Sequence, residues 1–176
     1  MTVIIGRCKM SIAEADGALE GLEGRIKPMR LFHNLERLVV AAVGGALMDA
    51  GRAFPIGDDS VGLYLAIDDS IEDVKDEYLR GIIEEGLIGA SPLLFPLTSP
   101  NALAAQVSIA FDMRGEGVVM PINGSGSDVI EYATECIDNN QVRKAIVCVI
   151  RAGDGNPPLE GRHYFGEVFV IEGGRL

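Results

Sequence analysis

The 176-residue chain is 48% hydrophobic, contains 22 glycines and has a formal net charge of −11 at pH 7. This length predicts a single domain, residues 1–176, with a well-packed core. The negative charge disfavours nucleic acid and anionic membrane surfaces as partners, because both attract basic side chains. No apolar run is long enough to span a membrane, and the N-terminal apolar run is too short for a signal peptide. We therefore expect a cytoplasmic protein.

The N-terminal part of the chain alternates between strand and helix patterns. A strand is predicted over residues 3–10, followed by a glycine-rich loop over 11–28. A long helix is predicted over 30–50, because apolar residues recur there at helical spacing, and Gly51 is placed as its C-terminal cap. Residues 61–67 are apolar throughout, which is typical of a strand covered on both faces.

The rest of the chain continues the alternation. Asp68, Asp69 and Ser70 are candidate N-caps of a helix over 71–86. The later elements are predicted as a loop at 89–100, a helix at 101–111, a strand at 118–122, a helix ending near 139, a strand at 144–150, a loop at 152–161 and a strand at 164–171. This order predicts parallel pairing in a layered α/β sheet, whereas the last two strands, with no helix between them, should pair antiparallel.

Three cysteines, Cys8, Cys136 and Cys148, are widely spaced and lack the spacing of metal ligands. We expect reduced thiols in the core, since free cysteine packs as a small hydrophobic residue. Pairs of adjacent carboxylates occur at residues 58–59, 68–69 and 84–85. They lie at loop or helix ends, where carboxylates are usually solvated or cap a helix, so we expect neither a metal ion nor a cofactor.

A strand, a tight glycine turn and a helix follow one another between residues 118 and 137. Gly124 and Gly126 permit the turn, because glycine accepts backbone angles that other residues resist. Ser125, Ser127 and Asp128 are candidate helix caps. Several enzyme folds present a nucleophile at such a turn, beside the free N–H groups at the positive end of the helix dipole.

Several sequence pieces resemble the N-terminal half of the β-ketoacyl synthases, in the thiolase-like superfamily. They are RLVVAAVGGALMDAG (37–51), DDSVGLYLAI (58–67), SPLLFPLTSPNALAAQVSIAFDMRG (91–115), AIVCVI (145–150) and GEVFVIE (166–172). The pieces occur in the family's order and at its spacing, over about residues 6–172. The resemblance implies one half of a thiolase-like fold: a three-layer α/β domain with a mixed, mostly parallel five-stranded sheet.

Two departures from the family pattern bear on catalysis. Laying Gly124–Ser125–Gly126 and Ala133 on the family's turn puts Asn123 at the position of the nucleophilic cysteine, and an amide cannot carry an acyl thioester. The second half-fold, which brings the family's catalytic histidines, is expected to be absent. The resemblance thus implies a non-catalytic β-ketoacyl synthase homologue, an accessory or complex-forming subunit in fatty-acid, polyketide or related acyl metabolism.

Two other functions remain open from the sequence. In the first, a separate histidine-bearing chain completes half of an active site, and the chain takes part in acyl-thioester condensation or in malonyl decarboxylation without acyl transfer. In the second, the chain is an acyl-coenzyme A-binding module that uses the turn and the proline-rich loop. The candidate binding residues are Asn123, Gly124, Ser125, Gly126, Phe95 and Asn101.

Other chemistries have weaker support in the sequence. A nucleophilic Ser125 or Ser127 would need a base, and neither of the two histidines, His33 and His163, matches a catalytic position of the family. The favoured interpretation is that these serines cap the helix. The turn also lacks the third glycine of a dinucleotide fingerprint, because Val129 stands there, and no P-loop lysine follows any glycine loop.

Two surfaces bear on partners. Asp128, Glu131, Glu135 and Asp138 share one helix face, which we expect in water or opposite a basic surface, because an unpaired buried charge costs several kcal/mol. The resemblance also implies a homodimer, or pairing with a second thiolase-like chain, through the strand at 118–122. Pro121 either protects that edge or shortens the pairing.

Overall fold

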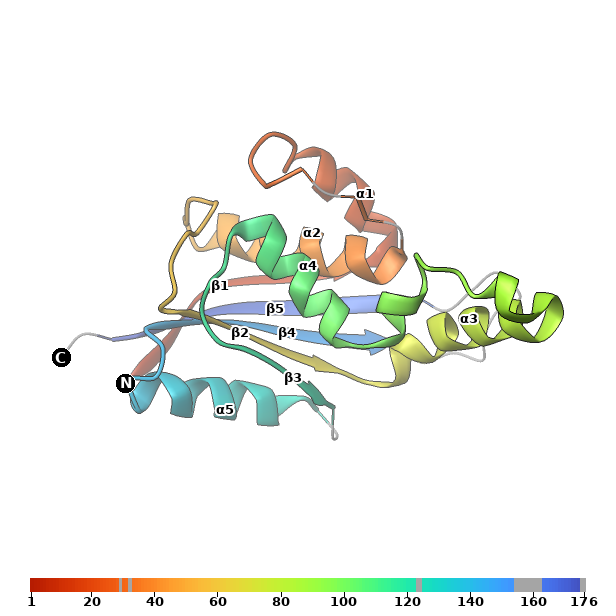
Figure 1. The fold of residues 1–176 in the computed structure, drawn as a ribbon. Coiled ribbons are helices and arrows are strands. Elements are labelled where there is room, and N and C mark those ends of the chain that lie inside the picture. Colours follow the sequence, from red (N-terminus) through yellow and green to blue (C-terminus); the bar gives the residue numbers. More distant parts are fainter. Residues whose placement is uncertain (29, 32, 123–124, 154–162, 175–176) are drawn as a thin grey trace.

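A computed structural model describes residues 1–28, 30–31, 33–122, 125–153 and 163–174 (Figure 1). Its centre is a five-stranded sheet in the order β1-β5-β4-β2-β3. The strands are β1 (Thr2–Ser11), β2 (Val61–Ile67), β3 (Gly117–Pro121), β4 (Lys144–Ala152) and β5 (Tyr164–Gly173). No helix of the described segments is both long and apolar enough to cross a membrane.

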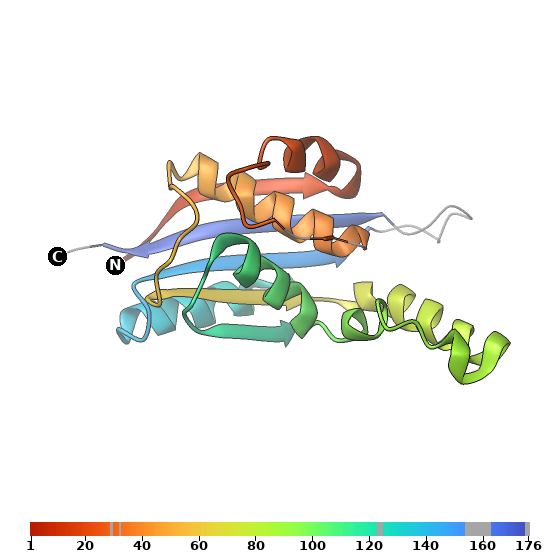
Figure 2. The ribbon, with the colours of Figure 1, turned by 45° about the horizontal axis from the view of Figure 1, so that its top comes forward.

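The helices lie on both faces of the sheet and at one end of it (Figures 1 and 2). They are α1 (Ile12–Glu20), α2 (Asn34–Asp49), α3 (Glu72–Glu85), α4 (Asn101–Phe111) and α5 (Ser127–Asp138), with short 3₁₀ turns at Asp69–Ile71, Gly86–Gly89 and Phe95–Thr98. Helices α2 and α4 cover one face, α1 packs on the outside of α2, and α5 covers the other face. The three predicted layers are therefore confirmed.

The strand directions confirm a mixed, mostly parallel sheet. β2 pairs parallel with both β3 and β4, whereas β5 pairs antiparallel with β4 and with β1. Every strand except β5 therefore runs in the same direction. The antiparallel pairing predicted for the last two strands is confirmed by β4 and β5.

Two hydrophobic cores form because side chains alternate between the faces of a strand. In β2, which is buried along its whole length, Leu63 and Leu65 enter the core beneath α2 and α4, whereas Tyr64 and Ala66 enter the core beneath α5. The prediction that both faces of this strand are covered is confirmed.

Two predictions about the first half of the chain need correction. The segment 11–28 is not all loop, because α1 occupies Ile12–Glu20. Its start is stabilised by Glu14, whose carboxylate accepts hydrogen bonds from the Ser11 N–H (2.8 Å) and hydroxyl (2.6 Å). Helix α2 begins at Asn34, four residues later than predicted, and Gly51 follows its C-cap, Ala50, with a φ of 61° that glycine tolerates.

The start of α2 depends on an uncharged histidine. The Leu35 N–H donates to His33 Nδ1 (3.1 Å), and the His33 N–H donates to the Glu36 carboxylate (2.9 Å). Burial, the largest cause, lowers the pKa of the His33 imidazole, and nearby carboxylates, Glu77 first, oppose this in part. A protonated Nδ1 could not accept the Leu35 N–H, so His33 caps the helix only when neutral.

We expect the free energy of unfolding to fall as the pH is lowered from 7.5 to 5.5. The pKa of His33 is lower in the folded chain than in the unfolded chain, so the unfolded chain binds the proton more tightly. This contribution is complete above the unfolded pKa, about 6.5, and is lost as the pH falls from there through the folded pKa. Urea unfolding at each pH measures it.

Variants of the two histidines separate this cap from other titrating groups. His33→Asn keeps a side-chain acceptor at the N-cap position and should flatten the dependence between pH 7.5 and 5.5. His163→Asn is the control, because it replaces the other histidine, which lies exposed just before β5, and keeps the α2 cap. A slope that survives in His33→Asn would contradict the assignment.

Candidate functional site

The carboxyl ends of the parallel strands meet at one edge of the sheet. β2, β3 and β4 end there at Ile67, Pro121 and Ala152, and the turn into α5 begins at the same edge. In open α/β sheets, ligands bind outside the carboxyl ends of the strands. A ligand site is therefore expected at this edge.

Asp68 ties the ends of two strands together at this edge. One carboxylate oxygen accepts the Ser70 N–H (2.8 Å), and the other accepts the Ala152 N–H at the end of β4 (2.8 Å). Of the three N-cap candidates, Asp68 is thus the one that caps, and it caps the 3₁₀ turn that precedes α3. The edge is fixed by these local polar contacts as well as by the ladder of the sheet.

The turn before α5 is held against β4. Gly126 is the N-cap of α5, with a φ of 73°, and a Cβ there would lie 2.9 Å from Arg151 Nη2 and 3.0 Å from a Val149 methyl. Arg151 donates a hydrogen bond to the carbonyl oxygen of Ser125. Only glycine therefore fits both the backbone angle and the space at position 126.

The serines of the turn bond mainly to each other. The Ser125 hydroxyl donates to that of Ser127 (3.0 Å), and the Ser127 N–H lies 3.4 Å from the Ser125 oxygen, which makes a weak cap. The N-cap of α5 is Gly126, so the prediction that Ser127 or Asp128 caps this helix is wrong, and Ser125 makes only this weak contact. His33 lies at the start of α2, on the opposite face of the sheet from α5. Within the described chain, no hydrogen bond joins an imidazole to either serine.

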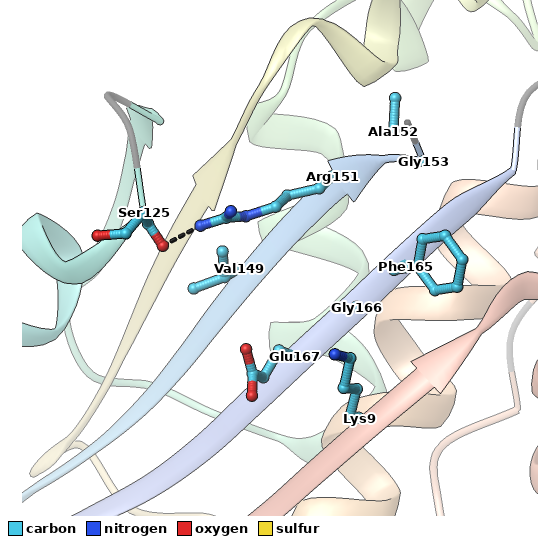
Figure 3. A pocket seen from close by; sticks show the side chains of 9 residues that line it. All are labelled: Lys9, Ser125, Val149, Arg151, Ala152, Gly153, Phe165, Gly166 and Glu167. Carbon is cyan, nitrogen blue, oxygen red and sulfur yellow. Dashed lines mark hydrogen bonds between the residues drawn. The ribbon is translucent and has the colours of Figure 1, made fainter. Parts of the chain in front are cut away.

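A hollow of about 390 Å³ lies beside this turn, on the face of the sheet that α5 covers (Figure 3). We call it the α5 pocket. Its lining includes Ser125 of the turn and five residues from three strands: Lys9, Val149, Arg151, Phe165 and Glu167. Strands β1, β4 and β5 thus contribute to one hollow at the start of α5.

The α5 pocket is positively charged although the chain is acidic. Glu167 is ion-paired with Arg7, whose guanidinium also lies 5.2 Å from the centre of the Phe169 ring. Arg151 donates to a neutral carbonyl, and neither Arg151 nor Lys9 has an ion pair within the described chain. The backbone N–H groups at the start of α5 carry partial positive charge, which the Asp128 carboxylate in the first turn offsets. The hollow therefore favours an anion.

The structure distributes the predicted binding residues over several places. Asn123 and Gly124 lie outside the described residues. Ser125 lines the α5 pocket, and Gly126 lies against Arg151 and Val149, which line it too. Asn101 lines a separate hollow of about 260 Å³ beside the end of β3. Phe95 is 62% exposed and packs against Tyr78, with ring centres 5.8 Å apart.

Sequence reasoning missed the charged residues of the α5 pocket. Arg151 is the one charge that follows the apolar run at 145–150, which is a weak signal at a strand end. No local sequence pattern marks Lys9 as a pocket residue. It lies at the pocket because β1 pairs with β5, which places Lys9 opposite Glu167. Contacts of that range cannot be read from local patterns.

The cysteines are free, as expected. Cys136 and Cys148 are buried and Cys8 is half-buried. Burial raises the pKa of the Cys148 thiol, and it is the largest cause of the raised pKa of Cys8. The thiols of Cys8 and Cys148 are therefore protonated at neutral pH.

The acidic face of α5 lies in solvent. Asp128, Glu131, Glu135 and Asp138 are all exposed, and none of the ion pairs in the described chain involves them. Asp138 accepts a hydrogen bond from the Thr2 hydroxyl (3.0 Å). In this chain alone the acidic face is therefore in water, which is one of the two environments that the sequence predicted for it.

β3 is an edge strand, and its hydrogen bonds show which groups point outward. Leu63 N–H donates to the Glu116 carbonyl and Ile122 N–H donates to the Ile67 carbonyl. Because bonding alternates along a strand, the N–H groups of Gly117 and Val119 point away from β2. Pro121 falls on the same outward side, so it shortens any further pairing and does not disturb the pairing with β2.

No protein-family model and no curated protein matches the sequence. Solved structures match its fold. The ishigamide ketosynthase/chain length factor aligns with a TM-score of 0.70 at 19% identity, over 98% of this chain and 62% of that chain. A β-ketoacyl synthase from Burkholderia phymatum gives 0.64 at 17%, over 97% and 58%. A ketosynthase in complex with its chain length factor from Xenorhabdus doucetiae gives 0.60 at 13%, over 98% and 79%.

These likenesses confirm the fold and, at such identities, the fold alone. The chain is similar to one half of a ketosynthase, and it spans about three fifths of the length of the first two structures named. The predicted half of a thiolase-like fold is therefore confirmed.

Proposed function

We propose that this chain is a non-catalytic β-ketoacyl synthase homologue, an accessory and complex-forming subunit in polyketide, fatty-acid or related acyl metabolism. The observation that carries the proposal is the match of 98% of the chain to the fold of a ketosynthase/chain length factor. A ketosynthase of this fold from Xenorhabdus doucetiae forms a complex with its chain length factor. A protein of this fold can therefore work as one subunit of a complex.

The cysteines support the non-catalytic part of the proposal. The resemblance puts Asn123 at the position of the nucleophile, and an amide does not attack a thioester. Cys136 and Cys148 are buried, Cys8 is half-buried in β1, and none of the three lies in the turn before α5. The raised pKa of the Cys148 thiol further disfavours the thiolate that acyl transfer requires.

Mass spectrometry of the intact chain tests this part. After incubation with acetyl-coenzyme A or malonyl-coenzyme A, the mass should stay unchanged, and coenzyme A should be released no faster than in buffer. Asn123→Cys is the matched control, because it places a thiol where the resemblance puts the nucleophile. An acyl adduct on the unaltered chain would overturn the proposal.

The free edge of β3 supports pairing with a second thiolase-like chain, and we take a second copy of this chain as that partner. An antiparallel arrangement centred on Val119 uses both outward N–H groups of each copy, those of Gly117 and Val119. It places Pro121, which lacks an N–H, opposite Gly117 of the second copy. The two sheets then continue across the interface, which covers an edge that would otherwise stay open.

We expect Val119→Pro to abolish the pairing without unfolding the chain. The substitution removes an outward N–H group and leaves the bonds to β2 in place. Met120→Pro is the matched contrast, because its N–H points toward β2 and its loss should lower the melting temperature. Gel filtration and circular dichroism measure both effects. A Val119→Pro chain with unchanged elution would count against this edge as the interface.

A further inference from the structure

The lysine and arginine side chains that line five hollows of the described chain are, with two exceptions, paired with carboxylates. The paired ones are Lys27 with Asp112, Arg37 with Asp16, Arg52 and Lys144 with Glu172, Lys75 with Glu72, and Arg143 with Asp58. The exceptions are Lys9 and Arg151, and both line the α5 pocket. In a chain with a net charge of −11, two uncompensated cations in one hollow are unusual.

The neighbouring groups leave this positive charge in place. Glu167, the carboxylate of the pocket, is already held by Arg7, so the four charged side chains around the hollow are three cations and one anion. Arg151 donates one N–H to the neutral Ser125 carbonyl, and the other N–H groups of its guanidinium remain available to a ligand. Figure 3 shows Arg151, Lys9 and Glu167 on the same face of the sheet.

Apart from Ser125, the uncharged side chains that line the pocket are apolar. Val149 forms part of its floor, and the Phe165 ring, which is 41% exposed, stands at one side (Figure 3). Gly153 and Gly166 line the pocket with their backbone. An exposed ring and a valine floor favour a short hydrocarbon segment over a wholly hydrophilic anion.

We propose that the α5 pocket binds a small carboxylic acid, whose carboxylate is held by Lys9 and Arg151 and whose short apolar tail covers Val149 and Phe165. The planar guanidinium matches a carboxylate in two parallel hydrogen bonds. The volume of about 390 Å³ accommodates a molecule of a few carbon atoms. The proposal does not depend on how the chain pairs, since β3 contributes no residue to the pocket.

The test is an NMR titration of the ¹⁵N-labelled chain at constant ionic strength. Three probes are compared: butyrate, butyramide as its neutral isostere, and inorganic phosphate as an anion without a tail. Butyrate should shift the amide signals of Gly153 and Gly166, and butyramide should not. Phosphate should bind more weakly than butyrate. Equal shifts with butyramide, or tighter binding of phosphate, would overturn the carboxylic acid as the ligand class.

Variants assign the binding to the two cations. Lys9→Gln and Arg151→Gln should each weaken butyrate binding roughly tenfold or more, because each removes a charge-assisted hydrogen bond. Lys9 is exposed, so its variant keeps the fold even if Arg151→Gln disturbs the turn. Arg143→Gln is the control, since Arg143 lines another hollow and is paired with Asp58. An equal loss in Arg143→Gln would mean that only the overall charge matters, and unchanged binding in Lys9→Gln would refute the site.

Discussion

Replacing Phe111 by alanine is expected to lower the free energy of unfolding by about 3–5 kcal/mol. Phe111 ends α4, is fully buried, and meets the Phe54 ring edge to face, with ring centres 5.6 Å apart. The substitution removes a large apolar side chain from the core between α2, α4 and the sheet, and it leaves a cavity that close-packed neighbours fill only in part. Urea unfolding measures the loss.

Ile109→Ala is the matched control for this experiment. Ile109 belongs to the same helix but is 53% exposed, so its truncation should change stability by less than about 0.5 kcal/mol. A Phe111→Ala chain that loses no more than this control would mean that α4 does not pack on the sheet as described.

Gly6→Ala should destabilise the chain by about 1–3 kcal/mol, although alanine is the smallest possible addition. At Gly6, β1 crosses α2 so closely that a Cβ would lie 2.5 Å from the Ala46 carbonyl oxygen and 2.6 Å from the Ala50 Cβ. A backbone carbonyl cannot turn aside, so strand and helix must separate. The pairing of β1 with β5 is also irregular between Ile4 and Gly6.

Gly17→Ala supplies a control of opposite sign. Gly17 lies inside α1, and a Cβ there meets nothing within 4 Å. Alanine at this position should raise stability by about 0.5–1 kcal/mol, because glycine is a poor helix former. Chemical denaturation of both variants gives the comparison. If Gly6→Ala were as stable as Gly17→Ala, the close crossing of β1 and α2 would be wrong.

Elements with strong local signals are the ones that sequence reasoning predicted well. The strand Val61–Ile67 and the helix Asn101–Phe111 begin and end where they were predicted. The strand is an unbroken apolar run. The helix follows Pro100, and proline is common at the start of a helix because its missing N–H is not needed there. The α1 helix was missed because its glycine suggested a loop, whereas Ser11 and Glu14 carry the signal for a helix start.

The candidate site was only partly visible in the sequence. Its turn was found, because Gly126 stands between a strand and a helix and has the positive φ that only glycine adopts easily. The cations of the α5 pocket were not found. Lys9 and Arg151 are far apart in the chain, and they line one hollow only because β5 lies between β1 and β4 in the sheet. Strand order is a property of the whole fold.

The acidic face of α5 makes the pairing of two copies depend on salt. Each copy carries four exposed carboxylates on this helix and a net charge of −11, so two copies repel at low ionic strength. An interface through β3 relies on backbone hydrogen bonds and apolar contact, which salt does not weaken. Added salt should therefore maintain or strengthen the association.

Sedimentation equilibrium at 0.1 M and 1 M sodium chloride tests the proposal of a complex-forming subunit most directly, because the Debye length falls from about 10 Å to about 3 Å between them. Pairing through β3 predicts a mass of twice 18.7 kDa at both concentrations of salt. A chain that stays at 18.7 kDa in both would contradict the pairing, and a dimer that dissociates in high salt would place the interface on charged surfaces instead of the β3 edge.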